Sequence, residues 1–129
     1  KYRQSLCVVR NFMEAIDQII SKLDRYSFHD MPVENIAFKT EDGTELTLDL
    51  FDYNEITKDY YRLKLSFRDI QKLEFSNISL AKESDLAVFS FHYEYLNSFK
   101  CKFLLLTGFG QPNFTIELSC ENIEIISEH

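Results

Sequence analysis

The sequence predicts an α+β fold, in which an N-terminal amphipathic helix packs on an antiparallel, largely meandering β-sheet or half-barrel of about seven to eight strands. Apolar residues recur at steps of three and four only near the N-terminus, and they alternate with polar residues after Pro32. The chain has 129 residues, of which 45% are hydrophobic. A chain of this length and composition buries roughly two-thirds of its unfolded surface. We therefore expect a single domain spanning residues 1–129.

Residues 6–25 have the periodicity of a helix with one apolar face. Polar residues such as Arg10, Glu14 and Asp17 occupy the other face. The apolar stripe is short for a coiled-coil seam, so packing against the sheet is the preferred interpretation. The stripe consists of Val9, Phe12, Met13, Ile16, Ile19, Ile20 and Leu23.

A β-hairpin is predicted directly after Pro32, which disfavours helix at the residue before it. Apolar residues alternate over 36–38 and again over 46–50, and Asp42-Gly43 between them is a typical tight-turn pair. After the polar segment 52–59, residues 61–68 alternate cleanly between apolar and cationic or polar side chains. A short strand at 70–75 is expected to follow a turn near Asp69.

The second half of the chain repeats this pattern of alternating segments and turn residues. No alternation of long helices with strands appears, which argues against a parallel doubly wound sheet. The expected strands are 88–95, 99–105, 114–120 and 123–125, with a polar loop at 82–85 and turns at 97–98 and 108–112.

The chain contains three cysteines, Cys7, Cys101 and Cys120, in no CxxC pair. An odd, scattered set is typical of reduced core thiols, which indicates a cytoplasmic protein without a bound metal or other cofactor. No apolar run approaches the roughly 18 residues of a membrane span. No basic segment followed by an apolar stretch marks an export signal either, although the sequence begins at Lys1 rather than Met.

Negative charge is concentrated in two segments. The net charge is −7; residues 41–59 contain seven acidic side chains and one lysine, and residues 117–129 contain four acidic side chains and no lysine or arginine. Such a field repels nucleic acids and membrane surfaces and attracts basic proteins. We therefore expect a basic protein partner and no nucleic-acid or membrane binding.

The interaction surface is expected within or beside the first acidic segment, where tyrosines stand among the carboxylates. Aromatic side chains next to charges are common anchors of protein interfaces. An acidic surface exposed to solvent without any partner is the alternative interpretation. The predicted partner-binding residues are Asp49, Asp52, Tyr53, Glu55, Asp59, Tyr60 and Tyr61.

Catalysis is a weaker hypothesis, based on two histidines that lie close to carboxylates. His29 precedes Asp30, but adjacent residues of an extended chain point to opposite sides, so turn formation before Pro32 is the simpler role. His92 and Glu94 share one strand face, which a solvated surface explains equally well. We therefore predict that the protein is not an enzyme.

Two further sets of residues have both a structural and a functional interpretation. The aromatic row on strand 88–95 either lines a small-molecule cavity or fills the core under the helix. The cationic face of strand 61–68 either binds an anion or pairs with carboxylates on neighbouring strands. The aromatic row is Phe89, Phe91, Tyr93 and Tyr95, and the cationic face is Arg62, Lys64 and Arg68.

The segment Phe28-His29-Asp30, followed by the apolar strand that begins at Val33, resembles the opening of small bacterial immunity proteins of polymorphic and contact-dependent toxin systems. The later segment Leu65-Ser66-Phe67-Arg68-Asp69-Ile70 and the closing strand 114–126 are also similar in layout. This resemblance implies a non-catalytic cytoplasmic protein that binds and neutralises one cognate toxin domain. An acidic surface would suit a basic nuclease toxin.

Overall fold

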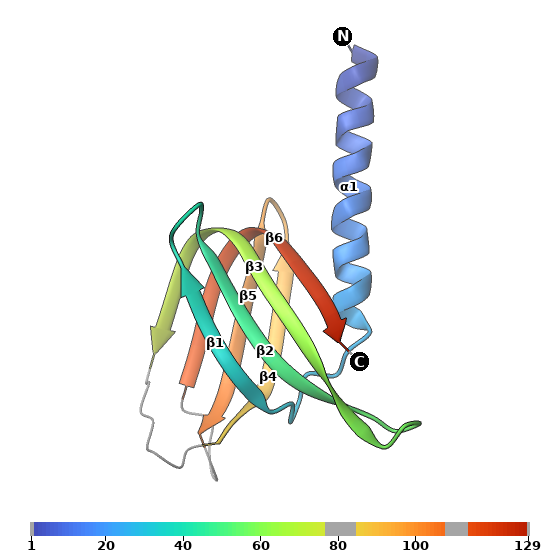
Figure 1. The fold of residues 1–129 in the computed structure, drawn as a ribbon. Helices are drawn as coiled ribbons and strands as arrows, with labels where there is room; N and C mark the ends of the chain where they lie inside the picture. Colours follow the sequence, from blue (N-terminus) through green and yellow to red (C-terminus); the bar gives the residue numbers. More distant parts are fainter. Residues whose placement is uncertain (1, 77–84, 108–113, 129) are drawn as a thin grey trace.

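A computed structural model of the chain describes residues 2–76, 85–107 and 114–128, and it describes side chains from residue 11 onward. Within these ranges the fold is α+β, with one helix packed on an open, curved antiparallel sheet (Figure 1). The elements are α1 (Tyr2–Asp24), β1 (Val33–Lys39), β2 (Glu45–Asn54), β3 (Asp59–Ser76), β4 (Leu86–Tyr95), β5 (Phe99–Thr107) and β6 (Phe114–Glu128).

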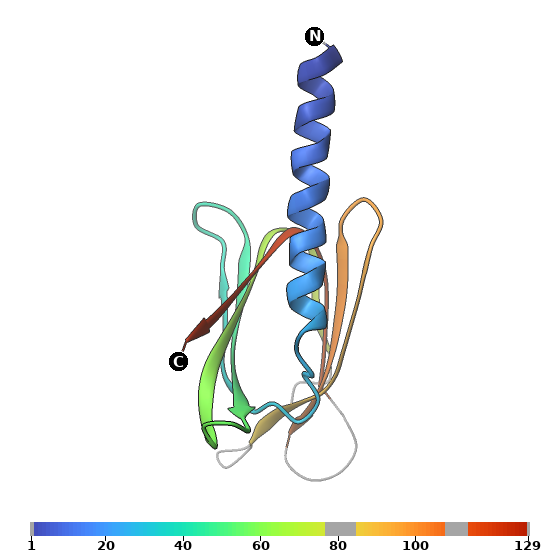
Figure 2. The same ribbon diagram turned by 90° about the vertical axis from the view of Figure 1, so that its right-hand side faces the viewer.

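The six strands are arranged in the order β1-β2-β3-β6-β5-β4. Strands β1 to β3 and strands β4 to β6 each form an antiparallel meander, and pairing of β3 with β6 joins the two halves. Viewed along the sheet, the two halves form opposing walls, and the end of α1 lies in the opening between them (Figure 2). The meander prediction therefore holds within each half, whereas the consecutive strands β3 and β4 are separated in the sheet by β6 and β5.

Two predicted strand breaks are absent, which is why the described residues contain six strands rather than seven or eight. In place of the expected turn near Asp69, β3 continues through a β-bulge: Asp69 adopts a positive φ of 55°, and the register with β6 shifts between Ile70 and Lys72. The Thr44 hydroxyl accepts a hydrogen bond from the Ile70 amide at 2.9 Å and donates one to the Ile70 carbonyl at 3.1 Å. Because Thr44 satisfies the backbone amide and carbonyl of Ile70 at the bulge, β3 continues and keeps pairing with β6. Strand β6 is likewise continuous through Glu121-Asn122, where a second break was expected.

The predicted hairpin around Asp42-Gly43 is confirmed as β1–β2. Asp42 and Gly43 have φ values of 59° and 106°, the left-handed conformations that tight hairpin turns require. The expected turns at 82–85 and 108–112 fall largely or wholly outside the described residues.

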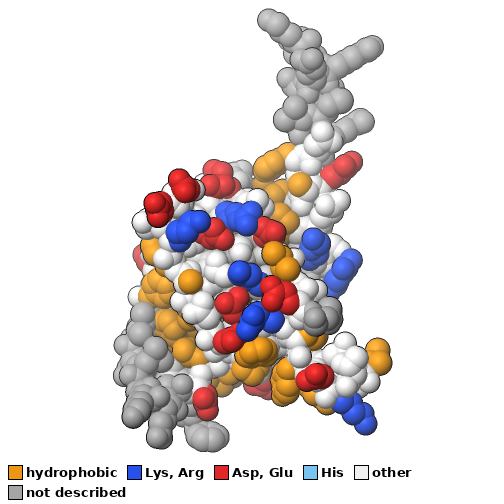
Figure 3. All heavy atoms as spheres, in the orientation of Figure 1, with side chains coloured by type: hydrophobic (Ala, Val, Ile, Leu, Met, Phe, Trp, Pro, Cys, Tyr) orange, Lys and Arg blue, Asp and Glu red, His pale blue; other side chains and the backbone are white. Residues whose placement is uncertain are grey.

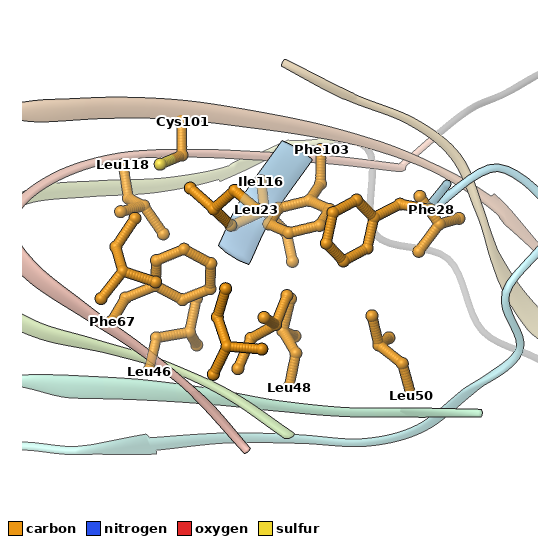
Figure 4. Packing of buried hydrophobic residues seen from close by; sticks show 14 of the residues in the cluster. Leu23, Phe28, Leu46, Leu48, Leu50, Phe67, Cys101, Phe103, Ile116 and Leu118 are labelled. Carbon is orange, nitrogen blue, oxygen red and sulfur yellow. The ribbon is translucent and has the colours of Figure 1, made fainter. Parts of the chain in front are cut away.

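The hydrophobic core fills the space between the two walls of the sheet (Figure 4). The side chains of Leu46, Leu48, Leu50, Leu63 and Leu65 on β2 and β3 face Phe103, Leu105 and Ile116 of the opposite wall, and all of them have 0% exposure. The thiols of Cys101 and Cys120 are also buried and not joined in a disulfide, as predicted, and the side chain of Cys7 lies outside those that the structure describes. A hydrogen bond with Cys120, together with burial, raises the pKa of the Cys101 thiol, which keeps it neutral and unreactive.

Among the side chains of α1 that the structure describes, from residue 11 onward, those that pack on the sheet lie in the second half of the helix. Ile16 and Leu23 are 5% and 2% exposed, whereas Phe12 and Met13 are 54% and 52% exposed. Figures 1 and 2 show why: the helix runs past the edge of the sheet, and its first half projects beyond it. The apolar stripe predicted from the sequence is therefore only partly used in the core.

The packed end of α1 is tied to β4 by a hydrogen bond from the Tyr93 hydroxyl to the Asp24 carboxylate. Burial, followed by this hydrogen bond and the charge of Asp24, raises the pKa of Tyr93 to about 12. Between pH 10 and 12 the unfolded chain therefore releases a proton that the folded chain retains. Stability from this group is complete below pH 10 and is lost as the pH rises through 12.

We expect the urea midpoint of the wild type to fall more steeply between pH 10 and 12 than that of Tyr93→Phe. Phenylalanine has no hydroxyl to ionise, so the difference between the two curves isolates this side chain. Tyr60→Phe, at a site 60% exposed, is the control and should keep the wild-type slope. Parallel curves for the wild type and Tyr93→Phe would show that ionisation of Tyr93 does not cause the loss of stability between pH 10 and 12.

Candidate functional site: the β2–β3 hairpin tip

The hairpin formed by the end of β2 and the start of β3 projects away from the body of the sheet (Figure 1). We call residues 52–61 the hairpin tip. The Asn54 side chain accepts hydrogen bonds from the amides of Ile56 and Thr57 at 2.9 and 3.2 Å, and Lys58 adopts a positive φ of 55°. These contacts define the turn from within, so no other element is needed to hold it.

Strand alternation places the tyrosines of the tip on opposite faces. Tyr53 and Tyr60 are direct cross-strand partners whose ring centroids lie 5.1 Å apart. They are 45% and 60% exposed. Asp52 and Tyr61 form the next pair, with the Tyr61 hydroxyl donating to Asp52 at 2.5 Å.

Tyr61 and Asp52 continue the face of the hairpin that buries Leu50 and Leu63 nearer the body. Burial, followed by the hydrogen bond and the negative charge of Asp52, raises the pKa of the Tyr61 hydroxyl, so it stays a hydrogen-bond donor. This pair therefore holds the two strands together where the core ends, and the Tyr53–Tyr60 pair is left facing solvent.

The turn itself exposes a large apolar side chain among carboxylates. Ile56 is 93% exposed, and both Glu55 and Asp59 beside it are exposed. Three acidic side chains and one lysine give the tip a net negative charge. Figure 3 shows this projection at the lower right, carrying hydrophobic and charged side chains together.

The structure thus brings six of the seven predicted partner-binding residues into one hairpin tip. Asp49 is the exception: it lies on the sheet body, opposite Lys64, and accepts a weak hydrogen bond from Asn35 at 3.4 Å. Ile56 was missed by the sequence analysis. Its signal was available, because it is the one large aliphatic residue between Leu50 and Leu63.

The acidic segment 41–59 does not form one continuous surface. Glu41 and Asp42 lie at the turn between β1 and β2, whereas Glu55 and Asp59 lie at the other end of the ten-residue strand β2. An extended strand of this length separates its ends by about 30 Å. The acidic surface predicted from composition is therefore reduced to the hairpin tip.

Of the predicted cationic face, Arg62 and Arg68 pair with carboxylates on other strands, as one of the two interpretations expected, whereas Lys64 has no ion pair within the described residues. Arg62 makes two hydrogen bonds of 3.0 Å with Glu34, and Arg68 lies 2.6 Å from Glu124. Arg68 also lies 3.8 Å from Glu45. Figure 3 shows the resulting interleaved positive and negative side chains on this face.

His29 belongs to a clasp that joins the segment before β1 to β4. Its Nδ1 lies 2.6 Å from the Phe89 carbonyl, and its Nε2 lies 3.3 Å from Asp30. The expectation that adjacent side chains diverge was wrong here, because Asp30 has a φ of 67° rather than an extended conformation. The Asp30 amide donates to the Val88 carbonyl at 2.7 Å, which completes the clasp.

The aromatic row of β4 is interrupted at its first member. A bulge between Val88 and Ser90 turns Phe89 out of the row, and Phe89 is 39% exposed. Phe91 stacks on Phe103 with ring centroids 4.3 Å apart. The remaining rings of the row pack against the core, as the structural interpretation expected.

The described ranges contain neither a group of three potential metal ligands nor a helix with the length and apolar character to cross a membrane. Comparison with known proteins yields no matching family model, curated protein or solved structure. The geometry of the chain itself therefore carries the functional argument.

Proposed function

We propose that this protein is a non-catalytic binding protein that contacts a basic protein partner through its hairpin tip. The observation that carries this proposal is the exposure of Ile56, Tyr53 and Tyr60 on an internally braced turn that also bears Glu55 and Asp59. Exposed apolar side chains surrounded by polar ones are typical of interaction sites.

The chemistry of the tip suits a basic surface with a small apolar pocket. Ile56 would enter the pocket, since a nearly fully exposed aliphatic side chain gains most from burial in a complex. The carboxylates would steer the encounter and form charged contacts at the rim. A turn that is already braced by Asn54 loses little conformational freedom on binding.

The resemblance to immunity proteins supports a more specific form of the proposal, in which the partner is a cognate bacterial toxin domain and binding neutralises it in the cytoplasm. A nuclease toxin with a basic, phosphate-binding cleft is the class that an acidic hairpin would fit best. The hairpin would then occupy the cleft and exclude the nucleic-acid substrate.

The test is the affinity of Glu55→Lys and Ile56→Asp variants for the toxin domain encoded next to this protein, measured by titration calorimetry. Neither side chain supports the fold by a described contact, so both variants should remain folded. We expect each to weaken binding by tenfold or more, on the order of 1.4 kcal/mol or above. Rising salt should weaken the wild-type complex as well.

Glu41→Lys is the matched control, because it makes the same charge change at the opposite end of β2. Its affinity should stay within about twofold of the wild type. Equal losses for Glu41→Lys and Glu55→Lys would indicate a general field effect rather than a site. Unchanged affinity for both tip variants would remove the hairpin tip from the interface.

A further inference from the structure

A hollow of about 560 Å³ lies on the outer face of the sheet, over β3, β6, β5 and β4. Its volume is within the range of small-molecule sites. The hollow is distinct from the hairpin tip, which is formed by β2 and the start of β3. Two cross-strand rows form most of its lining: Lys72, Ser119, Lys100 and Glu94 are in one, and Glu74, Glu117, Lys102 and His92 are in the other. Tyr93, Cys101 and Leu118, from the strand positions between these rows, complete the lining.

The short side chain of Ser119 leaves space at the centre of the first row. It lies between Lys72 of β3 and Lys100 of β5 in the same register. Neighbouring strands are about 4.8 Å apart, so these two lysine backbones are separated by about 10 Å with only a short hydroxyl side chain between them. The row therefore places a hydroxyl next to a lysine on either side, at the floor of the hollow.

Most of the charges around the hollow are already paired. Lys72 lies 3.2 Å from Glu74, and Lys102 lies 3.3 Å from Glu117. All four side chains are at least half exposed, so these ion pairs are weak and their side chains can move when a ligand binds.

Lys100 and Glu94 are different. They stand directly opposite each other on β5 and β4, yet within the described part of the chain neither has an ion pair or a side-chain hydrogen bond. Opposite charges at directly paired positions usually attract each other across a sheet. Here both are exposed and open to a ligand at the same point of the hollow.

The balance of charges decides the class of ligand. Three lysines and three glutamates line the hollow, so the site has no excess of positive charge to hold a polyanion such as a nucleic acid. A ligand with one group of each sign satisfies both unpaired residues. We propose that the hollow binds a small zwitterion of the amino-acid or short-peptide class, with its carboxylate at Lys100 and Ser119 and its ammonium at Glu94.

The experiment is a titration of ¹⁵N-labelled protein with glycylglycine, followed by amide chemical shifts. We expect saturable shifts at Glu94, Lys100 and Ser119. Lys100→Gln and Glu94→Gln should each weaken binding about two- to fivefold, the effect of losing one exposed ion pair. Lys39→Gln, at the far end of β1, is the control and should bind as the wild type does.

Two probes test the class of ligand directly. Acetate supplies only the carboxylate, and N-acetylglycinamide supplies the peptide group without either charge; both should shift these amides less and without saturation. Linear shifts with glycylglycine, or equal binding by Lys100→Gln, would overturn the site. Equally tight binding of acetate or inorganic phosphate would overturn the zwitterion in favour of a simple anion.

Discussion

Replacing Phe103 by alanine is expected to lower the free energy of unfolding by about 3–5 kcal/mol, which is a large part of the 5–15 kcal/mol typical of a domain. Phe103 has 0% exposure and stands on β5, in the wall that faces β2 and β3. Its ring stacks on Phe91 at 4.3 Å and meets the edge of Phe67 at 5.9 Å. Removing it leaves a cavity that neither wall can close alone.

Urea unfolding, followed by circular dichroism, measures this loss. Phe38→Ala is the matched control, because it deletes the same atoms from the edge strand β1, where the ring is 49% exposed. We expect it to cost about 1 kcal/mol, in proportion to the smaller area it buries. Similar losses for the two variants would show that the walls are not coupled through Phe103.

The core could be predicted from the sequence because strand alternation is a local property. The rows Leu46, Leu48, Leu50 and Leu63, Leu65, Phe67 are read directly from every second residue, and all six side chains have 0% exposure. The turn at Asp42-Gly43 was equally local, since two residues with positive φ are needed there. Such features do not depend on the order of the strands.

Bulges could not be predicted in this way, because they are stabilised by distant residues. Asp69 is a residue type common in turns, but Thr44 hydrogen-bonds to the adjacent Ile70, and β3 continues through this position. The same is true of Phe89, where the clasp around His29 and Asp30 holds the bulge in β4. In both cases a contact between segments decides the local conformation.

The candidate site also combines features that local sequence predicts with features that depend on the arrangement of the strands. The clustering of Tyr53 and Tyr60 follows from their positions on either side of a short turn. The separation of Glu41 from Glu55 follows from the full extension of β2, which a count of charges along the sequence does not reveal. The hollow is invisible in the sequence, because its two rows draw on four strands whose order is set by the β3–β6 pairing.

The second large loss of stability is expected in α1, where side chains of the same apolar stripe differ widely in burial. We expect Leu23→Ala to lower the free energy of unfolding by about 2–5 kcal/mol, because Leu23 is 2% exposed and lies within the core between the two walls. Met13→Ala, on the same sequence-predicted stripe, should cost less than about 1 kcal/mol, since Met13 is 52% exposed.

Urea unfolding of the two variants, together with amide hydrogen exchange along α1, separates a docked helix end from a projecting one. Amides near Leu23 should exchange only on global unfolding, whereas those near Met13 should exchange by local opening. Equal destabilisation by the two substitutions would mean that the projecting half of α1 also packs against an apolar surface. A difference of 1 kcal/mol or more would instead show that the helix stabilises the domain through its last turns, where the buried side chains of its apolar stripe meet the open side of the sheet.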